Sequence, residues 1–217
     1  MTFNIRQSVF DRDGVPREKV ARQYQDQLIQ LSEQSPEGQT LREEQIEGGW
    51  TNLMLDFGLN YIGKTPPKMS SYDLREILFD LFPRKVSASE KEAPEIIREL
   101  QLFWTFLQRE FHLENAAACL KVLNEKKAAR ELKAEMSNPA NFGIAKSFVM
   151  MGMERGFDMS TQEGINEWML IYNAELAAGR GPRIPLPGEQ DANAKQVYSQ
   201  LSSMLGAGSR RRNRKKK

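Results

Sequence analysis

Residues 94–111 read PEIIRELQLFWTFLQREF, and this stretch decides the fold of the chain. Its large apolar residues recur at steps of three and four, which is the spacing of one face of an α-helix. Leu102 and Phe106 widen that face beyond a single stripe. We therefore expect a central helix that is buried on more than one side, and such a helix needs other helices around it.

The segments on either side of this stretch show the same helical spacing of apolar residues. The predicted helices cover residues 16–31, 41–61, 71–82, 94–111, 113–135, 141–155 and 160–178. Few segments alternate with period two, and β-branched residues are sparse. The sequence thus predicts an all-α protein, an irregular multi-helix bundle of about seven helices with a flexible basic C-terminal tail.

Polar and turn-forming residues mark where these helices begin and end. Ser89 with Glu92 three residues later has the form of a capping box before the central helix. The predicted N-caps of three other helices are Ser71, Asn141 and Ser160. Pro16 fits a first helical turn, and Pro83 and Gly156 are predicted stops. Residues 32–40 are predicted to be a loop, and Gly48-Gly49 marks the expected break in the second helix.

Composition along the chain suggests how it is divided. We expect a flexible N-terminus over residues 1–15, one helical domain over 16–178 and a Pro/Gly linker over 179–189. Residues 190–205 carry Val197, Leu201, Met204 and Leu205 and predict a weak helix. Residues 206–217 are predicted to be a basic disordered tail.

Charge is distributed unevenly along the 217 residues. Seven of the last eight residues are basic, and removing them from the 31 Lys and Arg leaves 24 against 29 Asp and Glu. Residues 1–209 therefore carry a formal charge of −5. An acidic body with a cationic end differs from a uniformly basic nucleic-acid-binding domain.

The chain has few residues suited to metal or nucleophilic chemistry. It contains one cysteine, Cys119, and one histidine, His112, whereas a zinc ribbon or finger needs four such ligands. Cys119 lies among alanines and is expected to be buried and inert, and His112 is expected to cap a helix end or lie at the surface. We interpret Glu43, Glu44 and Glu47 as a solvated face. We therefore predict no enzyme activity, no catalytic residue, no metal and no cofactor.

Two other features bear on location and on binding. No apolar run approaches the roughly 20 residues of a membrane-spanning helix, and the N-terminus lacks a secretory pattern, so we expect a cytoplasmic protein. Methionines cluster at positions 150, 151, 153 and 159. They are interpreted first as core packing and second as a flexible groove for a partner helix.

The basic tail is the strongest functional signal. The predicted nucleic-acid-binding residues are Arg210, Arg211, Arg212, Arg214, Lys215, Lys216 and Lys217. Such a segment gains most by displacing counterions from a polyanion such as RNA. A solubilising end, an anionic membrane surface and a nuclear-import signal are the alternatives. Because no aromatic residue interleaves the tail, base stacking and sequence readout are not indicated.

Several phrases of the sequence resemble a known family. These are residues 73–86 (DLREILFDLFPRKV), 138–148 (NPANFGIAKSF), 156–158 (GFD) and 167–173 (EWMLIYN). Together they resemble an uncharacterised bacterial all-helical domain that often accompanies the small zinc-binding SEC-C motif. The zinc motif itself is absent here, so no zinc-dependent role follows. The resemblance implies a helical body with a C-terminal docking segment.

These observations lead to one functional prediction and one alternative. We predict a non-enzymatic accessory protein whose helical body contacts a protein partner and whose tail tethers it to RNA or a ribonucleoprotein. The alternative is a protein-only assembly or scaffold factor whose tail serves solubility.

Overall fold

The computed structural model describes residues 3–124 and 127–180. Within these ranges the chain is helical, with an isolated β-bridge between Phe10 and Pro16 and no strand. The all-α prediction is confirmed. When π-helical turns are joined to the α-helices that they continue, the described residues form nine helices rather than about seven. No helix in this part of the chain is long and apolar enough to cross a membrane.

The described residues divide into two compact units, whereas the sequence predicts a single helical domain over 16–178. The first unit comprises residues 3–83 and 88–137, and the second comprises 84–87 and 138–180. The boundary after residue 137 falls at Asn138-Pro139, which interrupts the helical pattern. Residues 84–87 belong to the second unit, where the Gly143 N–H donates to the Arg84 carbonyl at 2.8 Å.

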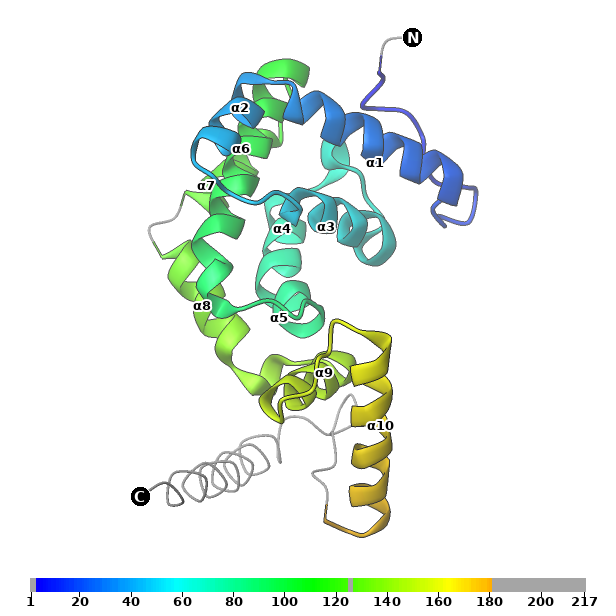
Figure 1. Cartoon of the computed structure of the whole chain (residues 1–217). Helices are drawn as coiled ribbons and strands as arrows, with labels where there is room; N and C mark the ends of the chain where they lie inside the picture. The colour runs from blue at the N-terminus through cyan, green and yellow to red at the C-terminus, as the bar shows by residue number, and fades with distance from the viewer. Residues whose placement is uncertain (1–2, 125–126, 181–217) are drawn as a thin grey trace. The chain divides into compact units, whose positions relative to one another are not determined.

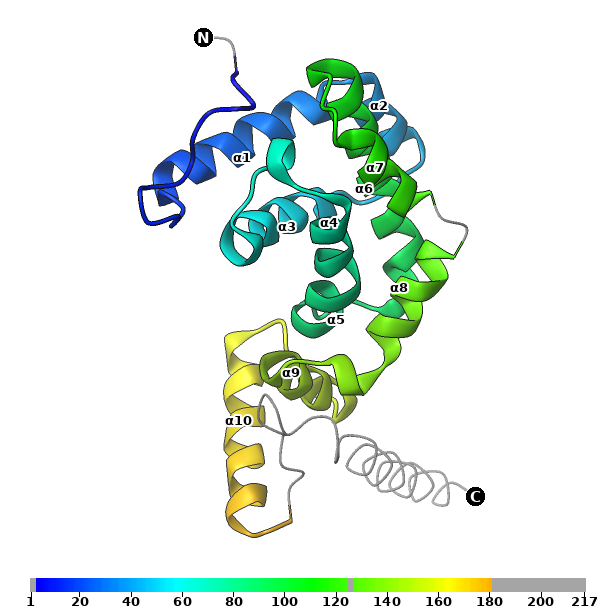
Figure 2. The same ribbon diagram turned by 180° about the vertical axis from the view of Figure 1, so that it is seen from behind.

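The first unit is built around one long helix. Its α-helices are α1 (Glu18–Glu33), α2 (Pro36–Glu43), α3 (Trp50–Phe57), α4 (Ser71–Glu76), α6 (Ala93–Phe111), α7 (Ala116–Leu123) and α8 (Ala128–Ser137). Figure 1 and, from behind, Figure 2 show α6 between its neighbours, and it packs against α2, α3, α7 and α8. Its buried residues include Ile96, Leu100, Phe103, Trp104 and Leu107. The predicted central helix is thus confirmed.

The predicted start of α6 is also confirmed. Ser89 and Glu92 form the capping box, with the Ser89 N–H donating to the Glu92 carboxylate at 2.9 Å. A short 3-10 turn, Glu90–Glu92, precedes α6, and Pro94 lies in the first turn. Two orphan N–H groups of the helix end are therefore satisfied by local side chains.

Residues 32–40, predicted to be a loop, contain most of α2 instead. The Ser35 hydroxyl caps the helix by accepting the Gly38 N–H at 3.1 Å, and Pro36 occupies the first helical position. A Cβ on Gly38 would lie 2.3 Å from the Ser32 carbonyl oxygen, so glycine allows the turn between α1 and α2. Polar composition suggested a loop, but these residues are helix-start residues.

The predicted break at Gly48-Gly49 is confirmed. Gly49 has a φ of +135°, a conformation that residues with a Cβ rarely adopt, and α3 begins at the next residue. A π-helical turn, Gly58–Ile62, continues α3 to its end, and a 3-10 turn, Pro66–Lys68, follows.

Pro83 does not end the third predicted helix. The helix runs from α4 through a π-helical turn, Ile77–Leu81, into α5 (Phe82–Lys85), which crosses from the first unit into the second. A regular helix would press the proline ring against the carbonyl of Phe79, and the wider π-turn just before Pro83 relieves that conflict. The N-cap is Ser70 rather than Ser71, and Ser70 forms a capping box with Asp73.

The predicted helix over 113–135 is two helices, α7 and α8. The buried side of α7 carries Ala116, Cys119 and Leu123, whereas Ala117 is exposed. Burial of Cys119 was predicted correctly. Burial raises the pKa of its thiol to about 12, with a further contribution from the charge of Asp73, so the thiol is unreactive.

Residues 3–15 pack on the first unit instead of forming a flexible arm. Val9 is completely buried, and the Tyr24 hydroxyl donates to the Ile5 carbonyl at 3.0 Å. The Phe3 ring contacts the rings of Tyr24 and Phe111. Pro16 pairs with Phe10 and lies before α1 rather than in its first turn. The apolar residues of this segment do not recur with a helical or strand period, so no periodic pattern indicates their burial.

The second unit is a pair of helices around an aromatic core. These are α9 (Ile144–Glu154) and α10 (Gln162–Ala177), with a 3-10 turn, Pro139–Asn141, before them. The Trp168 ring is fully buried and contacts the rings of Phe148, Phe157 and Tyr172. Its Nε1–H donates to the Phe148 carbonyl at 2.9 Å, so the indole is fixed from both helices.

In the second unit, the N-cap residues of both helices lie one or two positions after the predicted ones. Gly143, not Asn141, precedes α9, and Thr161, not Ser160, caps α10 through its hydroxyl. The predicted stop at Gly156 is confirmed. The N–H groups of Gly156 and Phe157 donate to the carbonyls of Met153 and Gly152, which is the Schellman pattern.

Candidate interaction surfaces

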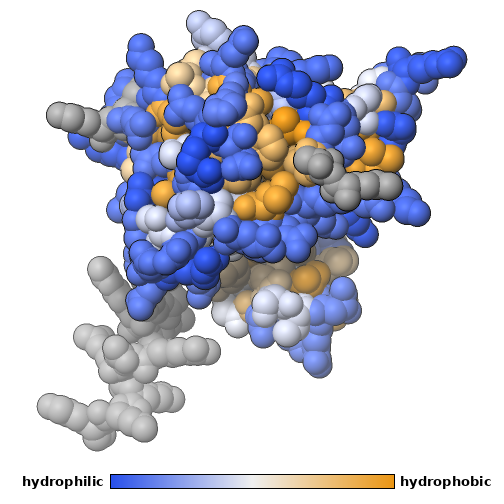
Figure 3. All heavy atoms as spheres, turned by 90° about the horizontal axis from the view of Figure 1, so that it is seen from above, coloured by the Kyte–Doolittle hydropathy of each residue, from blue (hydrophilic) through white to orange (hydrophobic). Residues whose placement is uncertain are grey.

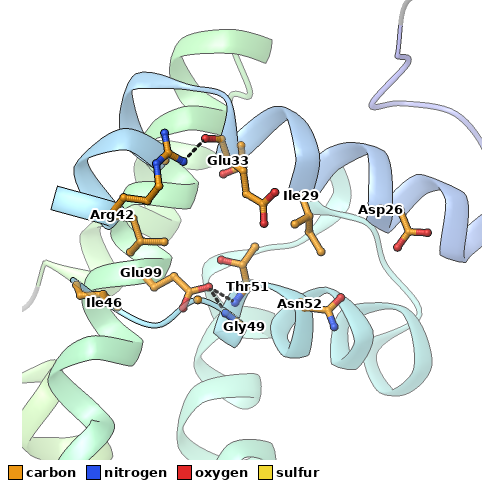
Figure 4. A pocket seen from close by; sticks show the side chains of 13 residues that line it. Asp26, Ile29, Glu33, Arg42, Ile46, Gly49, Thr51, Asn52 and Glu99 are labelled. Atoms are coloured by element: carbon orange, nitrogen blue, oxygen red, sulfur yellow. Dashed lines mark hydrogen bonds between the residues drawn. The ribbon is translucent and has the colours of Figure 1, made fainter. Parts of the chain in front are cut away.

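An open pocket of about 720 Å³ lies in the first unit between α1, the end of α2 and the start of α3 (Figure 4). Charged and apolar side chains line it together. They include Asp26, Ile29, Glu33, Arg42, Thr51 and Glu99.

Glu99 is the buried carboxylate of this pocket, and its side chain is 3% exposed. It extends from α6 to the start of α3 (Figure 4), where Oε1 accepts the N–H groups of Gly49 at 3.2 Å and Thr51 at 2.8 Å. Oε2 accepts the Trp50 N–H at 3.2 Å. Because the N-cap residue Gly49 has no side chain, Glu99 supplies the missing cap from another helix. Its oxygens are therefore engaged in holding α3 on α6.

Another charged side chain of the pocket also links helices. The Arg42 guanidinium donates to the Glu33 carbonyl at 2.7 Å. The contacts of Glu99 and Arg42 explain the polar character of the pocket as structural, and we assign it no chemical role. Away from the pocket lining, Arg109 on α6 forms a two-point ion pair with Glu37 on α2, with distances of 2.9 and 3.0 Å.

The structure gives the histidine and the three glutamates considered in the sequence structural or surface positions. His112 is exposed and forms the C-cap of α6 in a left-handed conformation with a φ of +49°. This confirms the predicted helix-end position. Glu44 pairs with Arg98 at 2.8 Å at the surface, and Glu43 and Glu47 are exposed. In residues 3–124 and 127–180, no three His, Cys, Asp or Glu side chains group so as to hold a metal ion.

The seven predicted nucleic-acid-binding residues, 210–212 and 214–217, lie outside the described residues. So does the weak helix predicted over 190–205. The prediction of tail binding to RNA therefore stays a prediction.

The clearest surface feature of the second unit is apolar and lies on α10. Trp168 and Tyr172 point into the aromatic core, but large apolar side chains also occupy the other sides of the helix. We call these exposed side chains the α10 outer surface; they are Met169 (44% exposed), Leu170 (74%), Ile171 (40%) and Leu176 (37%). Over residues 168–172 the helix is apolar on all sides, which is typical of a buried helix, so this part of α10 has more apolar surface than α9 covers.

The charged residues of α10 itself are all acidic. Residues of α10 include Glu163, Glu167 and Glu175 and no Lys or Arg. Glu163 and Glu167 are exposed and precede Leu170 by seven and three residues, so they share its side of the helix. Glu175 pairs with Arg155 at 2.6 Å. Leu170 thus lies beside two exposed carboxylates, those of Glu163 and Glu167. Their negative charge favours basic groups on a partner that binds there.

Exposed apolar side chains elsewhere are more scattered. Tyr72, on α4 of the first unit, is 82% exposed. Figure 3, a view from above, shows a mostly hydrophilic face with hydrophobic residues grouped near its centre. An isolated apolar residue such as Tyr72 is normal on a protein surface.

The methionines at positions 151 and 159 fit the core-packing interpretation, whereas Met153 is exposed. Met151 is buried and Met159 packs against the same aromatic core, as core packing predicts. Met153 is 54% exposed. Sequence reasoning noted the apolar residues of α10 but did not recognise that five consecutive positions, 168–172, place them on every side of the helix. That run was the available signal for an uncovered surface.

Comparison of the chain with protein-family models, with curated proteins and with solved structures gives no match. The resemblance to the helical domain that accompanies the SEC-C motif therefore stays a prediction.

Proposed function

We propose that this chain is a non-enzymatic accessory protein that binds a protein partner through its helical body and RNA or a ribonucleoprotein through its basic tail. The observation that carries the first half is the α10 outer surface, where four large apolar side chains remain exposed after the aromatic core of the unit is complete.

The chemistry of this surface favours one kind of partner. Apolar side chains on an exposed helix fit the apolar face of a second helix, through anchors spaced by three and four residues. The exposed carboxylates of Glu163 and Glu167 favour Lys or Arg beside those anchors. We therefore propose an amphipathic helix with basic flanks as the segment that binds α10.

The test compares the proteins that the tagged 217-residue chain and its variants capture from an extract of the native cell. The extract is treated with nuclease first, so that RNA does not bridge the captured proteins. The variant Leu170→Asp places a charge on the α10 outer surface, and Tyr72→Asp makes the same change at an exposed apolar residue of the first unit. We expect one or more proteins to bind the wild type and Tyr72→Asp but to be lost with Leu170→Asp. Equal capture by all three proteins would contradict the role of α10.

The alternative, a protein-only scaffold whose tail serves solubility, is distinguished in the same experiment. Under the proposal, RNA accompanies the untreated protein and disappears when residues 210–217 are deleted. Under the alternative, the captured proteins persist and RNA is absent from both forms. The basis for the tail in this proposal is its seven positive charges on an otherwise acidic chain.

A further inference from the structure

A second hollow of the first unit lies between its N-terminal segment and α1. Its volume is about 430 Å³, and the N-terminal segment runs along α1 in both ribbon views (Figures 1 and 2). Among the described residues that line it, none is charged and five of the eight carry a side-chain amide. We call this hollow the amide groove; its amide residues are Asn4, Gln7, Gln23, Gln27 and Gln30.

The four glutamine side chains of the amide groove hold no other part of the molecule. Within residues 3–124 and 127–180, none of these four amides forms a hydrogen bond. Glutamines elsewhere do pair inside the chain: the Gln39 amide donates to the Glu43 carboxylate at 2.8 Å, and the Gln101 amide donates to the Leu123 carbonyl at 2.9 Å. The donors and acceptors of the groove are therefore available to a ligand.

Apolar side chains complete the lining of the amide groove. Val20 and Leu31 lie at the two ends of the glutamine row on α1, and Phe3 belongs to the N-terminal segment. All three are half-buried, so part of each side chain is accessible. The Phe3 ring packs on the rings of Tyr24 and Phe111, which fixes this wall of the groove. A ligand thus meets apolar surface and amides, without charge.

The spacing of the glutamines on α1 matches the repeat of an extended peptide. Gln23 and Gln27 lie on one side of the helix and are roughly 6 Å apart along its axis. Peptide groups that point to the same edge of an extended chain recur about every 6.6 Å. A glutamine amide has the same donor and acceptor as a peptide group, so the two can pair through two hydrogen bonds. From Val20 to Leu31 the row is roughly 16 Å long, which is the length of about five extended residues.

We infer that the amide groove binds an uncharged peptide segment in extended conformation. The glutamines of α1 pair with the backbone of the segment, and its apolar side chains contact Phe3, Val20 and Leu31. A charged side chain would lose hydration in the groove without gaining an ion pair, because no described residue of the lining carries a charge. This site goes beyond the proposed function, since it depends neither on α10 nor on the basic tail.

The test is affinity selection from a library of random heptapeptides with blocked ends, using the 217-residue chain. Gln27→Glu replaces the amide in the middle of the row by a carboxylate of the same shape, and Gln108→Glu makes this change on α6, outside the groove. Both positions are exposed, so neither change should affect folding. We expect the wild type and Gln108→Glu to enrich the same uncharged peptides, and Gln27→Glu to bind them about tenfold more weakly. Equal binding by the three proteins, or enrichment of charged peptides alone, would overturn the inference.

Two measurements on a selected peptide locate its contact. In NMR spectra of the isotope-labelled protein, the peptide should shift the side-chain amide signals of Gln23 and Gln27 and leave that of Gln39 in place. Its affinity should change less than about twofold between about 50 and 500 mM salt, because no ion pair forms. A steep salt dependence would place the peptide on charged residues and overturn the inference. Selection of oligosaccharides but no peptides, lost with Gln27→Glu, would assign the groove to a sugar and overturn it as well.

Discussion

At the scale of single residues, Glu99 shows how a side chain from one helix completes another. Three backbone N–H groups at the start of α3 meet its two oxygens. The sequence shows Glu99 only as a polar residue interrupting the apolar face of the central helix. Its role depends on Gly48-Gly49, fifty residues earlier in the chain, being brought beside it.

We expect Glu99→Ala to lower the free energy of unfolding by about 2–4 kcal/mol, because three backbone donors, of which that of Thr51 is buried, lose their acceptor. Gln108→Ala, an exposed change on the same helix, is the control and should cost less than about 0.5 kcal/mol. Urea unfolding measured by circular dichroism gives both values. A similar loss for the two variants would mean that Glu99 is not a cap.

The ion pair between Glu37 and Arg109 belongs to the same scale. The hydrogen bonds from Arg109 hold the pKa of the Glu37 carboxyl below its usual value. A carboxyl whose pKa is lower in the folded state stabilises the protein above its unfolded pKa, and this contribution is lost as pH falls through the folded pKa.

We therefore expect Glu37→Gln to be less stable than the wild type at pH 7, and the difference to shrink as pH falls below about 4.5. Urea midpoints of the two proteins between pH 7 and pH 3 measure this. A difference that is constant over that range would show that the pair contributes nothing through its charge.

At the scale of elements, the close contact of α9 and α10 depends on a glycine. A Cβ on Gly152 would lie 2.4 Å from the Met159 Sδ and 2.8 Å from the Trp168 Cδ1. The sequence pattern explains Gly156 as a helix stop and assigns no role to Gly152. The packing role of Gly152 becomes visible only when the Trp168 ring is placed against α9.

We expect Gly152→Ala to destabilise the second unit by about 1–3 kcal/mol through overpacking. Gly48→Ala is the matched control, because a Cβ at Gly48 meets nothing within 4 Å. Hydrogen exchange of α9 and α10 should rise in the first variant and stay unchanged in the second. No change in Gly152→Ala would mean that Met159 moves aside without cost.

At the scale of the whole molecule, charge separates the acidic body from its cationic end. Deleting residues 210–217 removes seven positive charges and leaves the −5 of residues 1–209. We expect this deletion to abolish binding to a single-stranded RNA oligonucleotide at low salt and to leave the melting temperature unchanged. Filter binding and thermal unfolding measure the two effects.

The salt dependence of the full-length protein tests the same idea quantitatively. If the tail contacts about five phosphates, log K should fall with log salt at a slope of roughly −3.5. Retention of RNA by the truncated protein would place the binding site on the body and refute the tail as the tether.

The helical class and the central helix could be predicted from the sequence, because apolar spacing and the Ser89–Glu92 capping box are local properties. The sequence also located the break at Gly48-Gly49 and the stop at Gly156, which depend on the backbone freedom of glycine. Two predictions from composition were wrong. Residues 36–40 belong to α2, which the Ser35 cap starts, and the helix continues through Pro83, which the preceding π-turn allows.

Four features became visible only in the folded chain: the division into two units, the burial of Ile5 and Val9, the cap that Glu99 provides and the exposure of Leu170. Each of these depends on which segments meet across long stretches of sequence. Periodicity tells which side of a helix is apolar, but whether that side is covered depends on the elements that pack against it.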